Sequence, residues 1–254
     1  MAFKILIHTF RMIFGNFGQA LKVSVGPYAI LIGAMMILVA IAGTAGNGSV
    51  SQGYTTLALL PLVLLPAVFF VTAWVAVSWH RFILLEEYTS LLPAVQNRPI
   101  WSYAGKAILL GLIVGLAAVP IFLIMGLFSM GPMSSGSNGS ILGTLLFFGI
   151  AMIALSVIAI RLGVALVGTA LGKPMPFGDA FRATSSLNGT IVLLSILLAV
   201  INIVPSAFIG YFMLSIPAIA TILNFALQWL VMMLGISILT TIYGHVIEDR
   251  PLVS

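Results

Sequence analysis

A histidine and two glutamates at the end of a long apolar stretch have the side-chain types that metal binding and acid–base chemistry use. His80 is followed by Glu86 and Glu87, and an imidazole beside carboxylates is suited to hold a divalent metal or to move a proton. A metal site needs three or four ligands, and no second histidine lies near His80 in the sequence. The sequence therefore favours an interfacial histidine, bonded to headgroups or backbone beside Trp79, and predicts no catalytic residue, metal or cofactor.

Two arginines end successive apolar stretches in the same way. Arg81 and Arg161 each carry a planar guanidinium that can grip a phosphate through two parallel hydrogen bonds or close the free carbonyls at a helix end. Both interpretations are open, and both place these side chains at headgroup depth. With His80 and Arg182 they form the candidate site for a lipid headgroup, so the predicted partner is an anionic phospholipid.

The polar side chains inside the apolar stretches are amides rather than charges. Asn202, Asn224 and Gln228 either line a polar cavity or join the fifth and sixth spans by hydrogen bonds. No ionisable residue lies at a comparable depth, which argues against a proton-coupled carrier. Gly111 and Gly115 form a GxxxG motif, which either packs two helices of one chain together or marks a face between chains.

These side chains must be positioned by elements that lie in lipid. Of the 254 residues, 61% are hydrophobic and 6% are charged, and the mean hydropathy is +1.25, whereas a water-soluble domain needs about a quarter of its residues charged. The apolar runs lack strand-like alternation, so the predicted class is an all-α integral membrane protein. The basic residues are scattered singly, which argues against a nucleic-acid partner.

Six apolar runs are long enough to cross a bilayer core of about 30 Å. The chain is expected to form a single transmembrane domain, residues 1–254, with spans at 25–45, 56–78, 107–129, 141–160, 191–213 and 217–243. Residues 1–23 precede these spans and place apolar side chains at helical spacing, with Lys4, His8 and Arg11 on other faces. This pattern predicts an interfacial amphipathic helix.

All ten Lys and Arg residues fall on one side of this six-span arrangement, and so do all five acids. The positive-inside rule then places both termini in the cytoplasm. Each pair of spans is preceded by an amphipathic or mixed segment, and about 85 residues per unit is a length typical of structural repeats. The order of elements suggests three units, each an elbow segment followed by a hairpin.

Three short motifs resemble those of known membrane proteins. They are Ser78-Trp79-His80-Arg81-Phe82-Ile83-Leu84-Leu85-Glu86, Arg161-Leu-Gly-Val-Ala-Leu166 and Asp179-Ala-Phe-Arg182. The chain is similar in these motifs to a group of uncharacterised proteobacterial multi-pass membrane proteins, and more distantly it resembles the membrane domain of glycerophosphoryl diester phosphodiesterases. The resemblance implies a bacterial inner-membrane protein. It does not imply phosphodiesterase activity, because the catalytic domain with its metal-binding acids is not found in these 254 residues.

Three classes of function are open. We expect a non-catalytic scaffold or accessory subunit that packs against a larger membrane complex or forms a homo-oligomer, because charge is low and the far-side loops carry none. The alternative is a carrier or channel for a lipid or a poorly charged small molecule, which the amides favour. An enzyme ranks third, because the sequence has no phosphate-binding loop, no nucleophilic serine motif and no paired catalytic carboxylates.

Overall fold

The described part of the chain is almost entirely helical. The computed structural model describes residues 1–45, 50–130 and 138–252, so the loops expected at 46–55 and 131–140 lie partly outside the described residues. Within the described ranges there is no strand, and six helices are long and apolar enough to cross a membrane. The predicted all-α class with six candidate spans is confirmed. The elements are α1 (Ala2–Gly15), α2 (Phe17–Ala45), α3 (Val50–Leu85), α4 (Ile100–Met130), α5 (Asn138–Ala170), α6 (Phe177–Ala183), η3 (Ser185–Leu187), α7 (Asn188–Phe212) and α8 (Pro217–Val246).

The long helices extend beyond the spans expected from the sequence, at the end of each hairpin where the charged residues lie. The clearest difference concerns the fourth span, because the sequence predicts its end at Ile160 with Arg161 at the membrane edge. In the structure α5 continues through Arg161 to Ala170. The helix can pass through this arginine because the neighbouring segment supplies a carbonyl and a hydroxyl to its guanidinium.

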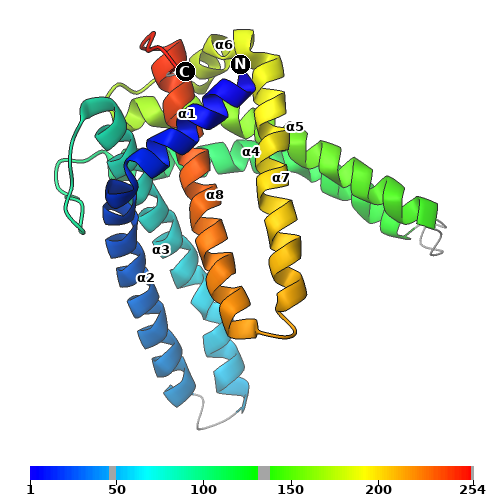
Figure 1. Cartoon of the computed structure of the whole chain (residues 1–254). Coiled ribbons are helices and arrows are strands. Elements are labelled where there is room, and N and C mark those ends of the chain that lie inside the picture. Colours follow the sequence, from blue (N-terminus) through cyan, green and yellow to red (C-terminus); the bar gives the residue numbers. More distant parts are fainter. Residues whose placement is uncertain (46–49, 131–137, 253–254) are drawn as a thin grey trace.

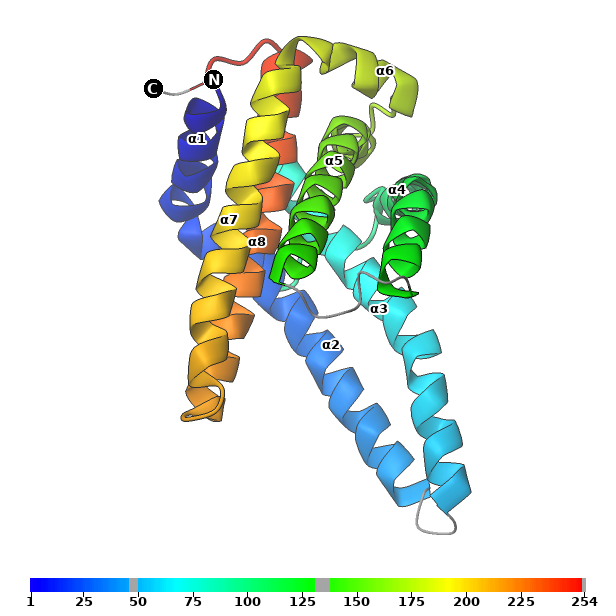
Figure 2. The ribbon, with the colours of Figure 1, turned by 90° about the vertical axis from the view of Figure 1, so that its right-hand side faces the viewer.

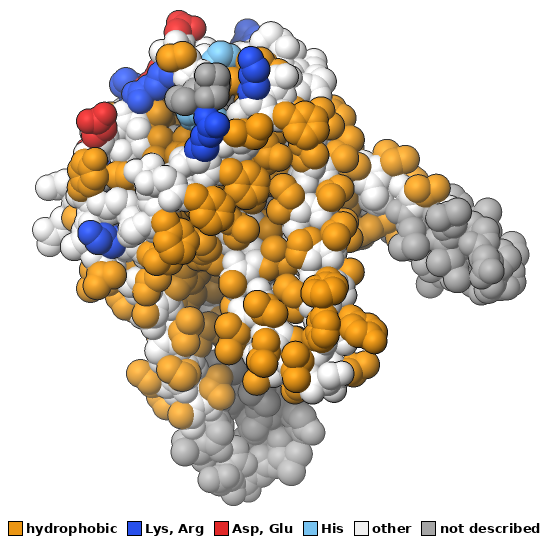
Figure 3. Space-filling model, in the orientation of Figure 1, with side chains coloured by type: hydrophobic (Ala, Val, Ile, Leu, Met, Phe, Trp, Pro, Cys, Tyr) orange, Lys and Arg blue, Asp and Glu red, His pale blue; other side chains and the backbone are white. Residues whose placement is uncertain are grey.

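The six long helices form three hairpins, α2–α3, α4–α5 and α7–α8. Their second members, α3, α5 and α8, contact one another at the end of the molecule where both termini lie. From this common centre the hairpins diverge, and α4–α5 points away from the other two (Figure 1 and Figure 2). The charged side chains gather toward the same end, which we call the basic end (Figure 3).

Each connecting segment lies against the hairpin that precedes it. The loop after α3 accepts a hydrogen bond from Trp74 of that helix, α6 packs against α5, and α1 packs against α8 and α7. The first segment of the chain therefore covers the last hairpin, and the three elbow-plus-hairpin units form a closed ring. The middle elbow is a loop rather than a helix, because Pro93 and Pro99 interrupt it and Glu86 and Asn97 adopt a positive φ.

Equivalent positions near the ends of α3, α5 and α8 are 80 residues apart in the sequence. Each of these side chains hydrogen-bonds to the connecting segment that packs against the hairpin to which the side chain belongs. The pairs are Arg81 with Glu87, Arg161 with Thr184, and Thr241 with Thr9. The three units thus share a contact scheme as well as an order of elements.

The packed core lies at the basic end. Trp79 and His80 of α3 and Met233, Ile238 and Ile242 of α8 are fully buried there. Packing differs between the helices, since 56% of the residues in an 18-residue apolar stretch of α5 are buried but only 6% in the corresponding stretch of α4. Most of the apolar surface of α4 is therefore left for lipid or for another protein.

Helix α1 presents three different faces along its length. One is buried against α7 and α8, the second is apolar and exposed, and the third is basic. An interfacial helix needs this division, because it meets protein, acyl chains and headgroups at once. The buried face holds Ile5, Thr9 and Ile13, the exposed apolar face Phe3, Ile7 and Phe14, and the basic face Lys4, His8 and Arg11.

Candidate functional site

His80 lies at the centre of the basic end and joins the three hairpins. Its side chain is fully buried in α3, its Nδ1 lies 2.8 Å from Thr240 Oγ1 of α8, and its Nε2 lies 3.3 Å from the hydroxyl oxygen of Tyr103 in α4. Each ring nitrogen therefore bonds to a residue from a different hairpin. The imidazole of His80 thus links the three hairpin units to one another.

The hydrogen bonds around His80 select one tautomer of the ring. The hydroxyl of Thr240 donates to the carbonyl of Ile236 at 2.9 Å, so its oxygen is left to accept the Nδ1–H of His80. Nε2 is then unprotonated and accepts the hydroxyl proton of Tyr103. In this state the neutral imidazole is satisfied on both sides, as a buried polar group must be.

The position of His80 differs from the interfacial one that the sequence favours. With no exposed surface, the ring does not reach a headgroup in this structure. Its two partners are a hydroxyl of α8 and a hydroxyl of α4, rather than metal ligands. Among the described residues no group of three or more His, Cys, Asp or Glu side chains could hold a metal ion.

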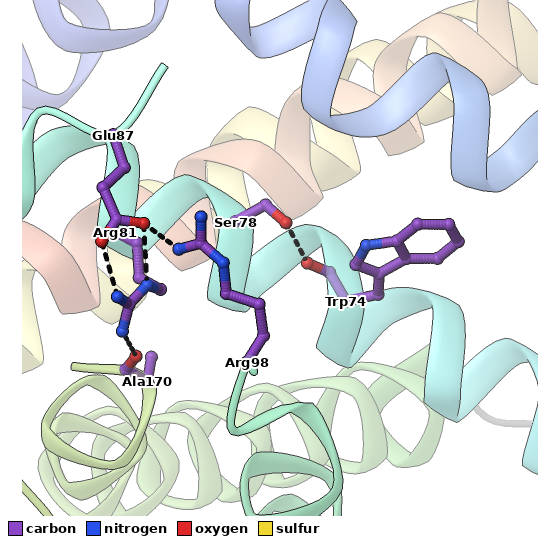
Figure 4. Close-up of polar contacts among 6 residues, drawn as sticks. All are labelled: Trp74, Ser78, Arg81, Glu87, Arg98 and Ala170. Carbon is purple, nitrogen blue, oxygen red and sulfur yellow. Dashed lines mark hydrogen bonds and ion pairs between the residues drawn. The ribbon is translucent and has the colours of Figure 1, made fainter. Parts of the chain in front are cut away.

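A cluster of two arginines and one carboxylate lies beside this centre (Figure 4). Arg81 donates from Nη2 to Glu87 Oε1 at 2.5 Å and from Nε to Glu87 Oε2 at 3.0 Å, and Arg98 also pairs with Glu87. The Nη1 of Arg81 donates to the carbonyl of Ala170 at the end of α5, at 3.1 Å. Arg81 thus caps the end of α5 and holds the loop that follows α3. Of the two roles that the sequence leaves open for this arginine, helix capping and phosphate binding, these contacts correspond to capping.

Arg98 remains a cation in this cluster. Burial, together with the positive charge of Arg81 beside it, lowers the pKa of Arg98 from its ordinary value. An arginine begins so far above neutrality that the side chain stays protonated at physiological pH. Two guanidinium groups and one carboxylate leave the cluster with one net positive charge.

The loop after α3 is fixed to the first hairpin at two further points. Trp74 Nε1 donates to the carbonyl of Pro93 at 3.1 Å, while within α3 the Ser78 hydroxyl donates to the carbonyl of Trp74 at 2.8 Å (Figure 4). On α2, a Cβ at Gly26 would lie 1.8 Å from the carbonyl oxygen of Leu91. Glycine is required there because any side chain would push the loop off the helix.

Arg161 is buried at the corresponding place in the second unit. Its Nε donates to Thr184 Oγ1 at 3.2 Å, its Nη2 donates to the carbonyl of Phe181, and its guanidinium carbon lies 3.4 Å from the centre of the Phe181 ring. The side chain is 8% exposed. These contacts occupy the guanidinium group, so Arg161 holds α6 against α5 and has little exposed surface with which to bind a phosphate.

Arg182 is the candidate headgroup residue that remains accessible. Its side chain is 81% exposed, and Nη2 lies 3.1 Å from Asp179 Oδ1, a pairing that contributes little at an exposed surface. Lys4, Lys22 and Lys173 are exposed at the same end. The sequence did not single out these lysines as site residues, although their spacing along the elbow segments marked them as interfacial.

The residues predicted to pack helices together lie on open faces. Gly111 and Gly115 are exposed on α4, and a Cβ at either position would meet nothing within 4 Å. Gln228 Nε2 donates to Asn224 Oδ1 at 3.5 Å, one turn away on α8, so this amide contact lies within one helix rather than between two. Asn202 is half-buried in α7.

Comparisons of the chain with family models, with curated proteins and with solved structures find no match. The fold and the site define a multi-pass membrane protein with six candidate spans. The resemblance to proteobacterial inner-membrane proteins stays a prediction.

Two site residues were missed by sequence reasoning, Thr240 and Tyr103. One signal could have found Thr240, because it stands two 80-residue steps after His80. Nothing in the sequence around Tyr103 sets it apart from the other interfacial aromatic residues.

Proposed function

We propose that the protein is a non-catalytic membrane scaffold or accessory subunit that presents its α4–α5 hairpin to another membrane protein. The observation that carries the proposal is the open face of α4. Its GxxxG motif packs against none of the described residues, since both glycines are exposed and have open space where a Cβ would stand. Small residues in this spacing let a second helix approach closely, and they are enriched where membrane helices associate.

The arrangement of the hairpins supports this role. Only 6% of the residues in an 18-residue apolar stretch of α4 are buried, and Leu112, Leu116 and Phe122 are more than half exposed on this helix. The basic end is by contrast fixed by buried hydrogen bonds between the units. A rigid centre with a projecting hairpin suits a protein that holds a partner in place.

The proposal includes a contact between the basic end and anionic lipid in the bacterial inner membrane, with both termini in the cytoplasm. Lys4, Arg11 and Lys22 lie along α1 and the start of α2, beside the exposed apolar face that contains Phe3 and Phe14. Each such cation near an anionic surface contributes about 1 kcal/mol to membrane association. This contact would fix the orientation of the scaffold rather than supply a specific lipid site.

The test is the mass of the assembly extracted from native membranes, compared between two variants of α4. The 26.9 kDa chain is expected to leave the membrane in a larger assembly with a second component at fixed stoichiometry. The double substitution G111L/G115L should release it, because leucine side chains separate the helices. Gly105→Leu is the matched control, since Gly105 is also exposed with open space around it but faces another side of α4. A monodisperse monomer from native membrane, or equal assembly of both variants, would contradict the proposal.

A further inference from the structure

Five uncharged polar residues lie at matched depths on the third hairpin. We call this set the polar stripe: Ser195, Asn202 and Ser206 on α7, and Asn224 and Gln228 on α8. The turn between these helices joins Phe212 to Pro217. Counting away from the turn on both helices brings Asn202 level with Gln228 and Ser206 level with Asn224. At 1.5 Å per residue, Asn202 and Gln228 lie about 15 Å from the turn, roughly halfway through a bilayer core.

The stripe on α8 lies on the side of the helix that faces α5. Leu239 is eleven residues after Gln228, which is three helical turns and therefore nearly the same direction. At the basic end Leu239 packs against α5, because a Cβ at Gly163 would lie 3.0 Å from a Leu239 methyl carbon. Further from that end α5 points away from α7 and α8 (Figure 1), and Gln228 is exposed.

The stripe on α7 shares one face of that helix. Asn202 and Ser206 follow Ser195 by seven and eleven residues, so all three point in nearly the same direction. Ser195 is 2% exposed, so the three residues share a packed face of α7, a helix that contacts α8, α5 and α1. The polar groups of α8 thus face the space that α5 leaves, and those of α7 lie on the packed face of the same hairpin.

The stripe holds hydrogen-bonding capacity that the described residues do not use. The hydroxyls of Ser195 and Ser206 are buried and find no partner among the described residues. Other hydroxyls in the spans, such as those of Thr221 and Thr241, bond to the carbonyl four residues earlier. The one contact within the stripe is the 3.5 Å bond from Gln228 to Asn224, which leaves further donors and acceptors of both amides unspent in the described structure.

We infer that the polar stripe binds an uncharged group carrying several hydroxyls, at mid-membrane depth between α7–α8 and α5. Amides and hydroxyls donate and accept at once, which matches a polyol and offers no counter-ion to a charged ligand. Neither α7 nor α8 contains any of the ten cations or five acids of the chain. The hydroxyls could belong to a neutral glycosyl lipid headgroup or to a free polyol, and the two sources share this chemistry. The inference concerns α7–α8 and does not rest on the scaffold role of α4.

The experiment uses the full chain in liposomes and two probes. One arm measures translocation of a fluorescent monoglucosyl diacylglycerol, and the other measures glycerol entry by vesicle swelling. The variant N224L/Q228L removes both amides, and Gln96→Leu makes the same change at an exposed loop position outside the spans. We expect one probe to move faster than in empty vesicles, with the double variant reduced at least about tenfold, which corresponds to about 1.4 kcal/mol, and with Q96L unchanged.

Thermal stability in detergent separates ligand binding from a packing role. Replacing exposed amides by leucine should leave the melting temperature unchanged or raise it if the amides await a ligand, and should lower it if they hold helices together. The exchanged variant N224Q/Q228N keeps both amides and should retain part of the transport. The inference is overturned if neither probe moves faster than in empty vesicles, if N224L/Q228L transports like the wild type, or if its melting temperature falls.

Discussion

The hydrogen bonds of His80 predict that removing one hydroxyl from α4 weakens the whole protein. Tyr103→Phe deletes the donor to Nε2 and leaves that nitrogen buried without a partner. An unsatisfied buried acceptor costs about 1–3 kcal/mol, and His80 offers no exposed surface for water to replace the bond. Thr240→Val should cost a similar amount, because it strands the Nδ1–H on the other side of the ring.

The three substitutions together should cost less than the separate losses suggest. Replacing His80 by Phe in the background of Y103F and T240V removes the stranded ring nitrogens as well as their partners, and such a replacement of a whole polar set is often nearly neutral. Residues in direct contact couple by about 0.5–3 kcal/mol. We therefore expect the triple variant to recover part of the stability that Y103F and T240V lose.

The free energy of unfolding can be measured by titrating the protein with denaturing detergent in mixed micelles and following tryptophan fluorescence. Tyr211→Phe and Thr221→Val are matched controls, since both side chains are exposed on α7 and α8 and exposed substitutions usually change stability by less than about 0.5 kcal/mol. The reasoning fails if Y103F is no more destabilised than Y211F, or if the triple variant is worse than the sum of the single losses.

Three further predictions concern other parts of the basic end. Arg161→Gln should cost about 1–3 kcal/mol of stability, since it removes the donors to the carbonyl of Phe181 and the hydroxyl of Thr184 and leaves these groups only the bonds within their own segment. Limited proteolysis should then cut first near α6, and equal resistance to protease would refute this. Burial and the nearby charge of Arg11 lower the pKa of His8 below 6.5, so the unfolded state binds the proton more readily. Stability is therefore full above about pH 6.5 and falls as the pH drops through that value toward the folded pKa. Protection of the α1 amides against hydrogen exchange, measured relative to their intrinsic rates at each pH, should fall on acidification in wild type but not in His8→Asn. In this cysteine-free chain, Ser215→Cys should react with an impermeant thiol reagent outside intact cells and Gln96→Cys should not, and the reverse result would invert the proposed orientation.

The six spans could be predicted because their signal is local. A run of about 20 apolar residues has few fates other than crossing a bilayer, whatever it packs against. The helix ends were harder, as Arg161 shows. A charge inside an apolar run normally marks the edge of a span, and only the position of Phe181 and Thr184 on a neighbouring segment allows α5 to continue through it.

The contacts of the candidate site could not be predicted, because they join distant parts of the chain. His80 and Thr240 are separated by 160 residues, and no local pattern in either helix specifies the other. The direction in which the α4–α5 hairpin points could not be predicted either, since an apolar helix surface has the same sequence pattern whether lipid or protein covers it. The open GxxxG face became visible only when the neighbours of Gly111 and Gly115 were known.

The position of α1 on the last hairpin has a consequence for the order of assembly. Thr9 meets Thr241 across 232 residues of sequence, so α1 cannot complete its docking surface on α7 and α8 until α8 has been synthesised. Until then its buried face, with Ile5 and Ile13, has only the membrane surface to rest on, which an amphipathic helix with exposed basic side chains tolerates. A contact between chain ends is also the slowest kind to form, because the longest loop must close first. Docking of α1 should therefore be the last step of folding, and a chain truncated before α8 should insert its first two hairpins while leaving α1 undocked and open to protease.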